Sequence, residues 1–118
     1  MPISPKTKIH HSVVIHNEDL INLYDCTINK DTQIGPFVEI QKNVTLGARC
    51  KISSHTFICE GVTIGNDVFI GHGVMFTNDK YPQSTNTNGK MQSRKDWNLI
   101  KTKVLDGASI GSNATILP

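Results

Sequence analysis

Apolar residues recur along this chain at a fixed interval of six. From residue 28 to residue 76, every sixth position holds a large apolar side chain, namely Ile28, Ile34, Ile40, Leu46, Ile52, Ile58, Ile64, Ile70 and Phe76. Two positions before each of these stands a small or β-branched residue, namely Cys26, Thr32, Val38, Val44, Cys50, Thr56, Val62, Val68 and Val74. Because side chains alternate along an extended segment, both members of a pair face the same side. The pattern predicts short strands with that side directed into a core.

A strict interval of six fits neither the 3.6-residue period of a helix nor the two-residue period of an ordinary strand. Glycine follows the apolar residue at five positions, namely Gly35, Gly47, Gly65, Gly71 and Gly111. There we expect a turn with backbone angles that only glycine adopts readily. Each hexad is then one strand and one corner, and three hexads form one coil of a prism with three parallel sheets.

The repeat has two irregularities. The register of Ile3, Ile9, Ile15 and Ile21 slips by one residue before Ile28, and we expect a bulged corner near residues 23–25. After residue 76 the pattern stops, and it resumes with Val104, Ile110 and Ile116. We therefore expect a single domain over residues 1–118, with coils at 1–76 and 102–118 and a loop excursion at 77–101. A loop of this length is either functional or disordered, and this one holds Tyr81 and Trp97.

Composition narrows the range of partners and locations. A formal net charge of +2 gives no field strong enough to gather a polyanion, so we expect no nucleic acid partner. The chain has no apolar run of about 20 residues and no apolar N-terminal signal, which predicts a cytoplasmic protein without membrane contact. The cysteines are widely spaced and are expected to be reduced structural thiols.

The [LIV]-G-x-x-x-x pattern resembles the left-handed β-helix of the hexapeptide acyltransferases. Within it, FIGHGVMFTNDKYP at 69–82 resembles the active-site segment of N-acetyltransferases that act on dTDP-3-amino-3,6-dideoxyhexoses or on UDP-linked 3-amino sugars. Asp96 and Trp97, and then GASIGSNATILP at 107–118, follow in the order of the same family.

This resemblance implies an all-β fold, a left-handed parallel β-helix with one long loop excursion. It implies transfer of acetyl from acetyl-CoA to the amino group of a nucleotide-linked 3-amino-3,6-dideoxy sugar, in the biosynthesis of surface polysaccharide such as lipopolysaccharide O-antigen. It further implies a homotrimer that binds its acyl donor between neighbouring subunits. Because family members continue with further coils after the segment that ends at Pro118, we expect a C-terminally shortened version of a longer domain.

The resemblance also suggests the site residues. Asn78 and Asp79, where the loop leaves the prism, would contact the sugar, although such residues also commonly cap turns. Tyr81 could hold the base of the loop, with its ring stacked on a nucleotide base or on a neighbouring subunit, or it could serve packing alone. His72 follows Gly71 at a corner and could accept the amine proton near neutral pH; alternatively, the proton passes to the departing CoA sulfur. No residue is assigned to acetyl-CoA.

Two other functions remain open from the sequence. A shortened helix could serve as a non-catalytic assembly or interaction module through an exposed end of the prism. A γ-class carbonic anhydrase would share the prism, but its zinc needs three close nitrogen ligands. Only His55 and His72 are expected near one edge, on adjoining coils, so we expect no metal.

Overall fold

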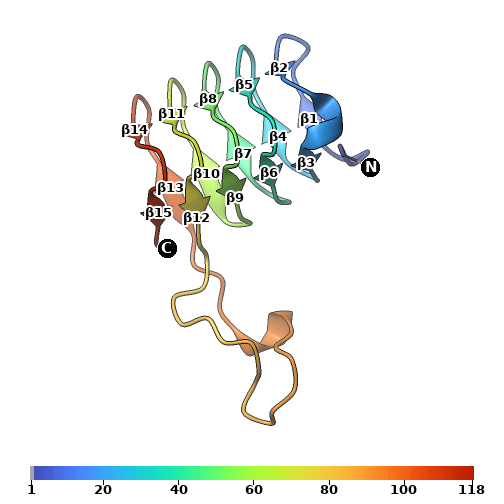
Figure 1. The fold of residues 1–118 in the computed structure, drawn as a ribbon, viewed down its shortest axis with the longest axis vertical. Helices are drawn as coiled ribbons and strands as arrows, with labels where there is room; N and C mark the ends of the chain where they lie inside the picture. Colours follow the sequence, from blue (N-terminus) through green and yellow to red (C-terminus); the bar gives the residue numbers. More distant parts are fainter. Residues whose placement is uncertain (1) are drawn as a thin grey trace.

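The computed structural model describes residues 2–118, which form a prism of stacked coils and one projecting loop (Figure 1). The first sheet has the order β1 (Lys8–Ile9), β4 (Thr27–Ile28), β7 (Thr45–Leu46), β10 (Val62–Ile64), β13 (Thr102–Val104). The second sheet has the order β2 (Val14–Ile15), β5 (Gln33–Ile34), β8 (Lys51–Ile52), β11 (Phe69–Ile70), β14 (Ser109–Ile110). The third sheet has the order β3 (Asn22–Leu23), β6 (Glu39–Ile40), β9 (Phe57–Ile58), β12 (Met75–Phe76), β15 (Thr115–Ile116).

All strand pairs in these sheets are parallel, and each strand pairs with the strand one coil away. Ile28, for example, pairs with Leu46, and Ile34 pairs with Ile52. The predicted all-β fold with three parallel sheets is confirmed, and the prism is consistent with the left-handed β-helix. Within residues 2–118 no helix has the length and apolar character needed to cross a membrane.

The predicted core positions fill the interior of the prism. Every apolar hexad residue from Ile28 to Phe76 is at most 1% exposed. The preceding small or β-branched residues are equally enclosed, and two of them are polar. The hydroxyl of Thr32 donates to the carbonyl of Gly47 at 2.9 Å, and that of Thr56 donates to the carbonyl of Gly71 at 3.0 Å. These bonds satisfy the two buried hydroxyls, so threonine is tolerated at a core position.

The glycines serve a different purpose from the predicted one. Positive φ angles at the corners belong mainly to other residues, among them Asp31, Phe37 and His55, and not to Gly47 or Gly71. A Cβ on Gly47 would instead collide with the carbonyl group of Gly65 on the next coil. The predicted conformational role is therefore wrong, because close approach between coils excludes a side chain there. Gly111, by contrast, has nothing within 4 Å of a built Cβ.

The register slip also has a different structure from the expected bulge. Leu23, not Ile21, occupies the apolar hexad position, and it pairs with Ile40. The extra residues lie before it, in a corner of residues 16–20 that contains the 3-10 turn η1 (Glu18–Leu20). The next corner, residues 24–25, is one residue shorter than a regular corner such as 29–31. The predicted bulge at 23–25 is wrong, since an earlier insertion and a later deletion together produce the slip.

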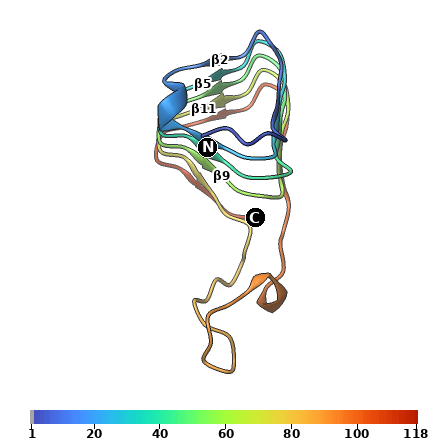
Figure 2. The ribbon, with the colours of Figure 1, turned by 90° about the vertical axis from the view of Figure 1, so that its right-hand side faces the viewer.

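Residues 77–101 leave the prism between β12 and β13 and project away from it (Figure 2). The two legs of this loop are tied at its base, where Ile100 N–H donates to the carbonyl of Asn78 at 2.8 Å. Farther out, the loop contains the 3-10 turn η2 (Arg94–Asp96) and one antiparallel bridge between Thr85 and Met91. The loop therefore has internal structure of its own and a fixed point of attachment.

Replacing Gly47 by alanine is expected to lower the free energy of unfolding by about 1–3 kcal/mol, because the added methyl group must displace the backbone of Gly65. Urea denaturation followed by circular dichroism measures this change. Gly111→Ala is the matched control, since its Cβ would meet open space, and it should leave stability nearly unchanged. Equal stabilities of the two variants would contradict the steric role of Gly47.

The cysteine thiols are expected to be unreactive in the folded protein. Cys26, Cys50 and Cys59 are free, as predicted, and all three are buried. Burial raises the pKa of all three thiols, that of Cys26 to about 11, and the thiolate is the reactive form. At about pH 8, an aromatic disulfide reagent should therefore label the native chain slowly and label all three thiols rapidly in urea. Rapid labelling without denaturant would contradict this burial.

Candidate functional site

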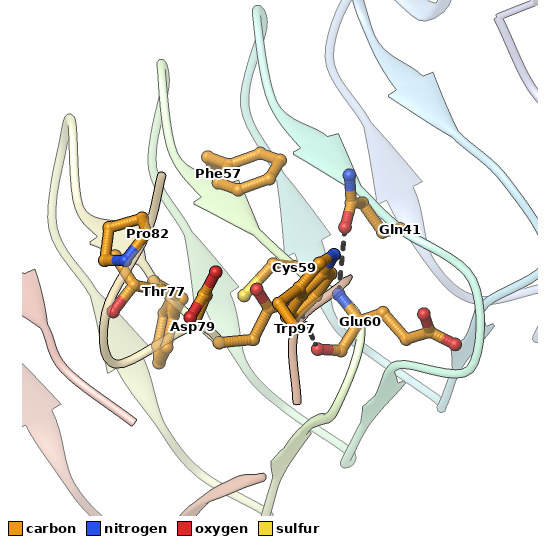
Figure 3. Close-up of a pocket in the computed structure, with 10 residues that line it drawn as sticks. Gln41, Phe57, Cys59, Glu60, Thr77, Asp79, Pro82 and Trp97 are labelled. Carbon is orange, nitrogen blue, oxygen red and sulfur yellow. Dashed lines mark hydrogen bonds between the residues drawn. The ribbon is translucent and has the colours of Figure 1, made fainter. Parts of the chain in front are cut away.

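A cavity of about 380 Å³ lies at the base of the loop, between the third sheet and the loop legs (Figure 3). Strands β9 and β12 contribute its floor, and residues 77–79, 82 and 97 contribute its wall. Its lining residues are Gln41, Phe57, Cys59, Glu60, Phe76, Thr77, Asn78, Asp79, Pro82 and Trp97. We call this the loop-base cavity.

The coil repeat places several of these residues above one another. Gln41, Cys59 and Thr77 each follow an apolar hexad residue directly, and they are 18 residues apart. Two hydrogen bonds connect these positions and the residues that follow them on successive coils. The N–H of Glu60 donates to Oε1 of Gln41 at 3.0 Å, and Nδ2 of Asn78 donates to the carbonyl of Glu60 at 2.9 Å. The side chain of Asn78 is thus held in place, and among residues 2–118 its Oδ1 has no hydrogen-bond donor.

Asp79 supplies the available negative charge of the loop-base cavity. Its Oδ1 accepts a hydrogen bond from the N–H of Tyr81 at 3.1 Å, which fixes the carboxylate at the start of the loop. Within the described chain this carboxylate has no cationic partner. Glu60 also lines the cavity, but its carboxylate points away from Asp79 in Figure 3 and accepts from Nδ2 of Asn43 at 3.0 Å. The charge of Asp79 is therefore free to bind a cationic group of a ligand.

Trp97 borders the loop-base cavity from the returning leg of the loop. The guanidinium of Arg94 lies over its ring at 4.8 Å from the centroid, and Nη1 of Arg94 donates to the carbonyl of Trp97 at 3.4 Å. A capping box between Ser93 and Asp96 holds η2 just before it. The backbone N–H of Ser93 donates to the Asp96 carboxylate at 2.8 Å and is the main cause that lowers the pKa of Asp96.

Tyr81 lies next to the loop-base cavity but does not line it. Its side chain is 75% exposed and borders an adjoining hollow of about 280 Å³, which Asp79 and Trp97 also line. Of the residues that the sequence suggested, the fold brings Asn78 and Asp79 into one cavity and leaves Tyr81 at its margin.

His72 lies at the opposite end of β12 from Asn78 and Asp79. Its Nδ1 is 2.9 Å from Oγ of Ser54, and its backbone N–H donates to Oγ of Ser112 at 3.0 Å. It lines a separate cavity of about 360 Å³ beside the second sheet. Within one chain, His72 and Asp79 therefore do not meet at one cavity.

His55 lies at the same edge of the prism as His72, on the adjoining coil, as the spacing predicted. The ring of His55 packs against Phe37, with 4.9 Å between the centroids. No group of three histidine, cysteine, aspartate or glutamate side chains suited to a metal ion occurs in residues 2–118.

Sequence reasoning did not assign Gln41, Phe57 or Trp97 to the site. Gln41 could have been assigned to the site from its spacing, because Gln41, Cys59 and Thr77 are 18 residues apart and residues one coil apart share a face. No spacing could have placed Trp97, since the loop follows no repeat.

Comparison with known proteins agrees with the repeat. Residues 25–60 match the family model described as bacterial transferase hexapeptide (six repeats). The bifunctional protein GlmU of Streptococcus suis is 38% identical over 90 residues, which cover 76% of this chain and 16% of that protein. GlmU of Streptococcus sanguinis is 27% identical over 113 residues, which cover 96% of this chain and 20% of that protein. The chain thus spans a fifth or less of the length of these relatives.

The acetyltransferase domain of PglB from Neisseria gonorrhoeae, solved in complex with acetyl coenzyme A, has a similar fold. Its TM-score is 0.50 at 13% sequence identity, and the match covers 98% of this chain and 50% of that chain. The structural match thus spans nearly the whole of this chain, whereas the family model matches residues 25–60 alone. The period of six and the parallel prism thus agree with the match of residues 25–60 to the hexapeptide repeat of bacterial transferases.

Proposed function

We propose that this chain is an acetyl-CoA-dependent N-acetyltransferase that acts on the amino group of a nucleotide-linked 3-amino-3,6-dideoxy sugar, in surface polysaccharide biosynthesis. The repeat of bacterial transferases and the fold shared with a domain solved with acetyl-CoA support acyl transfer from this donor. The sugar amine is proposed from the segment 69–82, which resembles the active-site segment of sugar-amine N-acetyltransferases.

One observation carries the proposal. The carboxylate of Asp79 has no cationic partner among the described residues, and it borders a cavity whose walls are largely apolar. An amino sugar is a cation at neutral pH with a partly apolar ring, and such a cavity matches both properties. Asn78 lies beside Asp79 and offers its Oδ1 to a sugar hydroxyl or to the amine.

The proposed reaction requires a neutral amine close to the thioester carbonyl. The nitrogen attacks the carbonyl carbon, the carbon–sulfur bond of the tetrahedral intermediate breaks, and CoA leaves as a thiolate. Asp79 would hold the group as an ammonium ion, which loses one proton to solvent and becomes the neutral nucleophile. The thiolate would then take up the second proton, which nitrogen loses after the attack. Because His72 lines another cavity, it would serve as the base only if a second copy of the chain carried it to the loop-base cavity. The proposed homotrimer would supply such a copy.

The direct test of the proposal measures CoA release from acetyl-CoA with dTDP-3-amino-3,6-dideoxyhexose as the acceptor. The 118-residue chain should release CoA in proportion to the acetylated sugar formed, as followed by mass spectrometry. Absence of turnover with dTDP- and UDP-linked 3-amino sugars would contradict the proposed activity of this chain.

Replacing Asp79 by asparagine should lower kcat/KM for the amino sugar roughly 10- to 100-fold, because a charge-assisted hydrogen bond to the amine contributes about 1.5–3 kcal/mol. The amide oxygen preserves the acceptor for the N–H of Tyr81. The same replacement at Asp19, an exposed residue of η1 on the first coil, is the matched control and should leave kcat/KM unchanged. An unaltered kcat/KM in Asp79→Asn would exclude Asp79 from amine binding.

His72→Asn is expected to keep kcat within about threefold of the original value, since proton transfer to the departing sulfur needs no histidine. The variant retains a hydrogen-bonding side chain near Ser54. Its pH–rate profile should have the same shape as that of the unmodified chain. A loss of roughly 10²-fold or more would instead identify His72 as the general base, and light scattering would then show whether the chain forms the oligomer that this role requires.

A further inference from the structure

The chain has a single tryptophan, and it borders the loop-base cavity. The other aromatic and ring residues of this cavity are Phe57, Phe76 and Pro82, and they give it a largely apolar part beside its polar residues. Trp97 comes from the returning leg of the loop, whereas the phenylalanines come from the third sheet. The indole is thus the aromatic ring that the loop adds to the cavity wall, beside Asn78, Asp79 and Pro82.

The loop holds this indole in a defined position. The capping box of Ser93 and Asp96 fixes η2, and the guanidinium of Arg94 then lies over one face of the Trp97 ring. The same guanidinium donates a hydrogen bond to the backbone carbonyl of Trp97. Arg94 therefore contacts both the ring and the backbone of this residue. Trp97 and Asp79 both line the loop-base cavity, so a ligand bound there would lie beside both side chains. Figure 3 shows Trp97 and Asp79 at this cavity.

We propose that Trp97 is the stacking platform for the pyranose ring of the acceptor and determines its specificity, an inference that rests on the proposed function. One face of a pyranose carries mainly C–H groups, and such a face is attracted to the flat apolar surface of an indole. With the ring against Trp97, the amino group of the sugar would point to Asp79. Trp97 would thus select for a sugar ring, and Asp79 would select for its amine.

Intrinsic fluorescence reports directly on this platform, because all indole emission comes from Trp97. The 118-residue chain is titrated with dTDP-3-amino-3,6-dideoxyhexose and, separately, with dTDP. A saturable change of emission is expected with the sugar-linked nucleotide and little change with dTDP. Equal changes with both ligands would overturn the proposal, since the indole would then respond to the nucleotide and not to the sugar.

Variants separate a stacking role from a structural one. Trp97→Leu should raise KM for the amino sugar about tenfold, with kcat within about threefold and KM for acetyl-CoA unchanged. Trp97→Phe retains a ring and should keep KM for the sugar within about threefold. Met91→Leu, at an exposed loop position outside the cavity, is the control and should match the unmodified chain. Thermal unfolding of all variants should coincide, because Trp97 lies outside the core of the prism.

The outcomes also distinguish the platform from the proposed function. Sugar-dependent quenching without turnover would retain Trp97 as the sugar platform and reject acetyl transfer. Turnover with an unchanged KM for the sugar in Trp97→Leu would retain acetyl transfer and reject the platform. Loss of sugar binding in Trp97→Leu but not in Trp97→Phe supports stacking on the ring.

Discussion

Backbone hydrogen bonding between successive coils is the constraint on which this structure depends. Its strands are two or three residues long and would have no stability alone. Each coil donates its N–H groups to carbonyls of the next coil, as when Gln33 donates to Cys50 at 2.9 Å and Gly35 donates to Ile52 at 2.8 Å. Coils therefore stack at the spacing of a parallel sheet, and the corner glycines must let the backbones approach that closely.

The same constraint decides where a loop can be inserted. Residues 77–101 interrupt the chain between β12 and β13, yet Val62 of β10 pairs in register with Thr102 of β13. These paired residues are 40 positions apart in the sequence, whereas paired residues of regular coils are 18 apart. The first sheet is nevertheless continuous, because the loop leaves and returns at one corner. Its legs are tied there by the bond between Ile100 and Asn78. The prism thereby provides a rigid base for a structure that follows no repeat.

The loop-base cavity combines these two parts. The repetitive surface contributes the stacked side chains Gln41 and Cys59 and the ring of Phe57. The loop contributes the charge of Asp79 and the indole of Trp97, each held by hydrogen bonds or packing within a few residues. Binding residues commonly lie on loops that a rigid scaffold holds in place. Here the prism positions the loop, and the loop supplies the charged and aromatic side chains.

The all-β class, the three parallel sheets and the core from Ile28 to Phe76 follow from the period of six alone, because each hexad has the same pattern and forms the same strand and corner. The end of the repeat also indicated where the loop departs and where Asn78 and Asp79 lie, since both residues follow the last regular strand within three positions. Two features became visible in the three-dimensional structure. Leu23 takes the apolar hexad position expected for Ile21, and a side chain at Gly47 would collide with Gly65 on the next coil. The tertiary structure likewise separated His72 from Asp79 and brought Trp97 to the cavity. These features depend on contacts between residues far apart in the chain, whereas a periodic pattern encodes only what each hexad does locally.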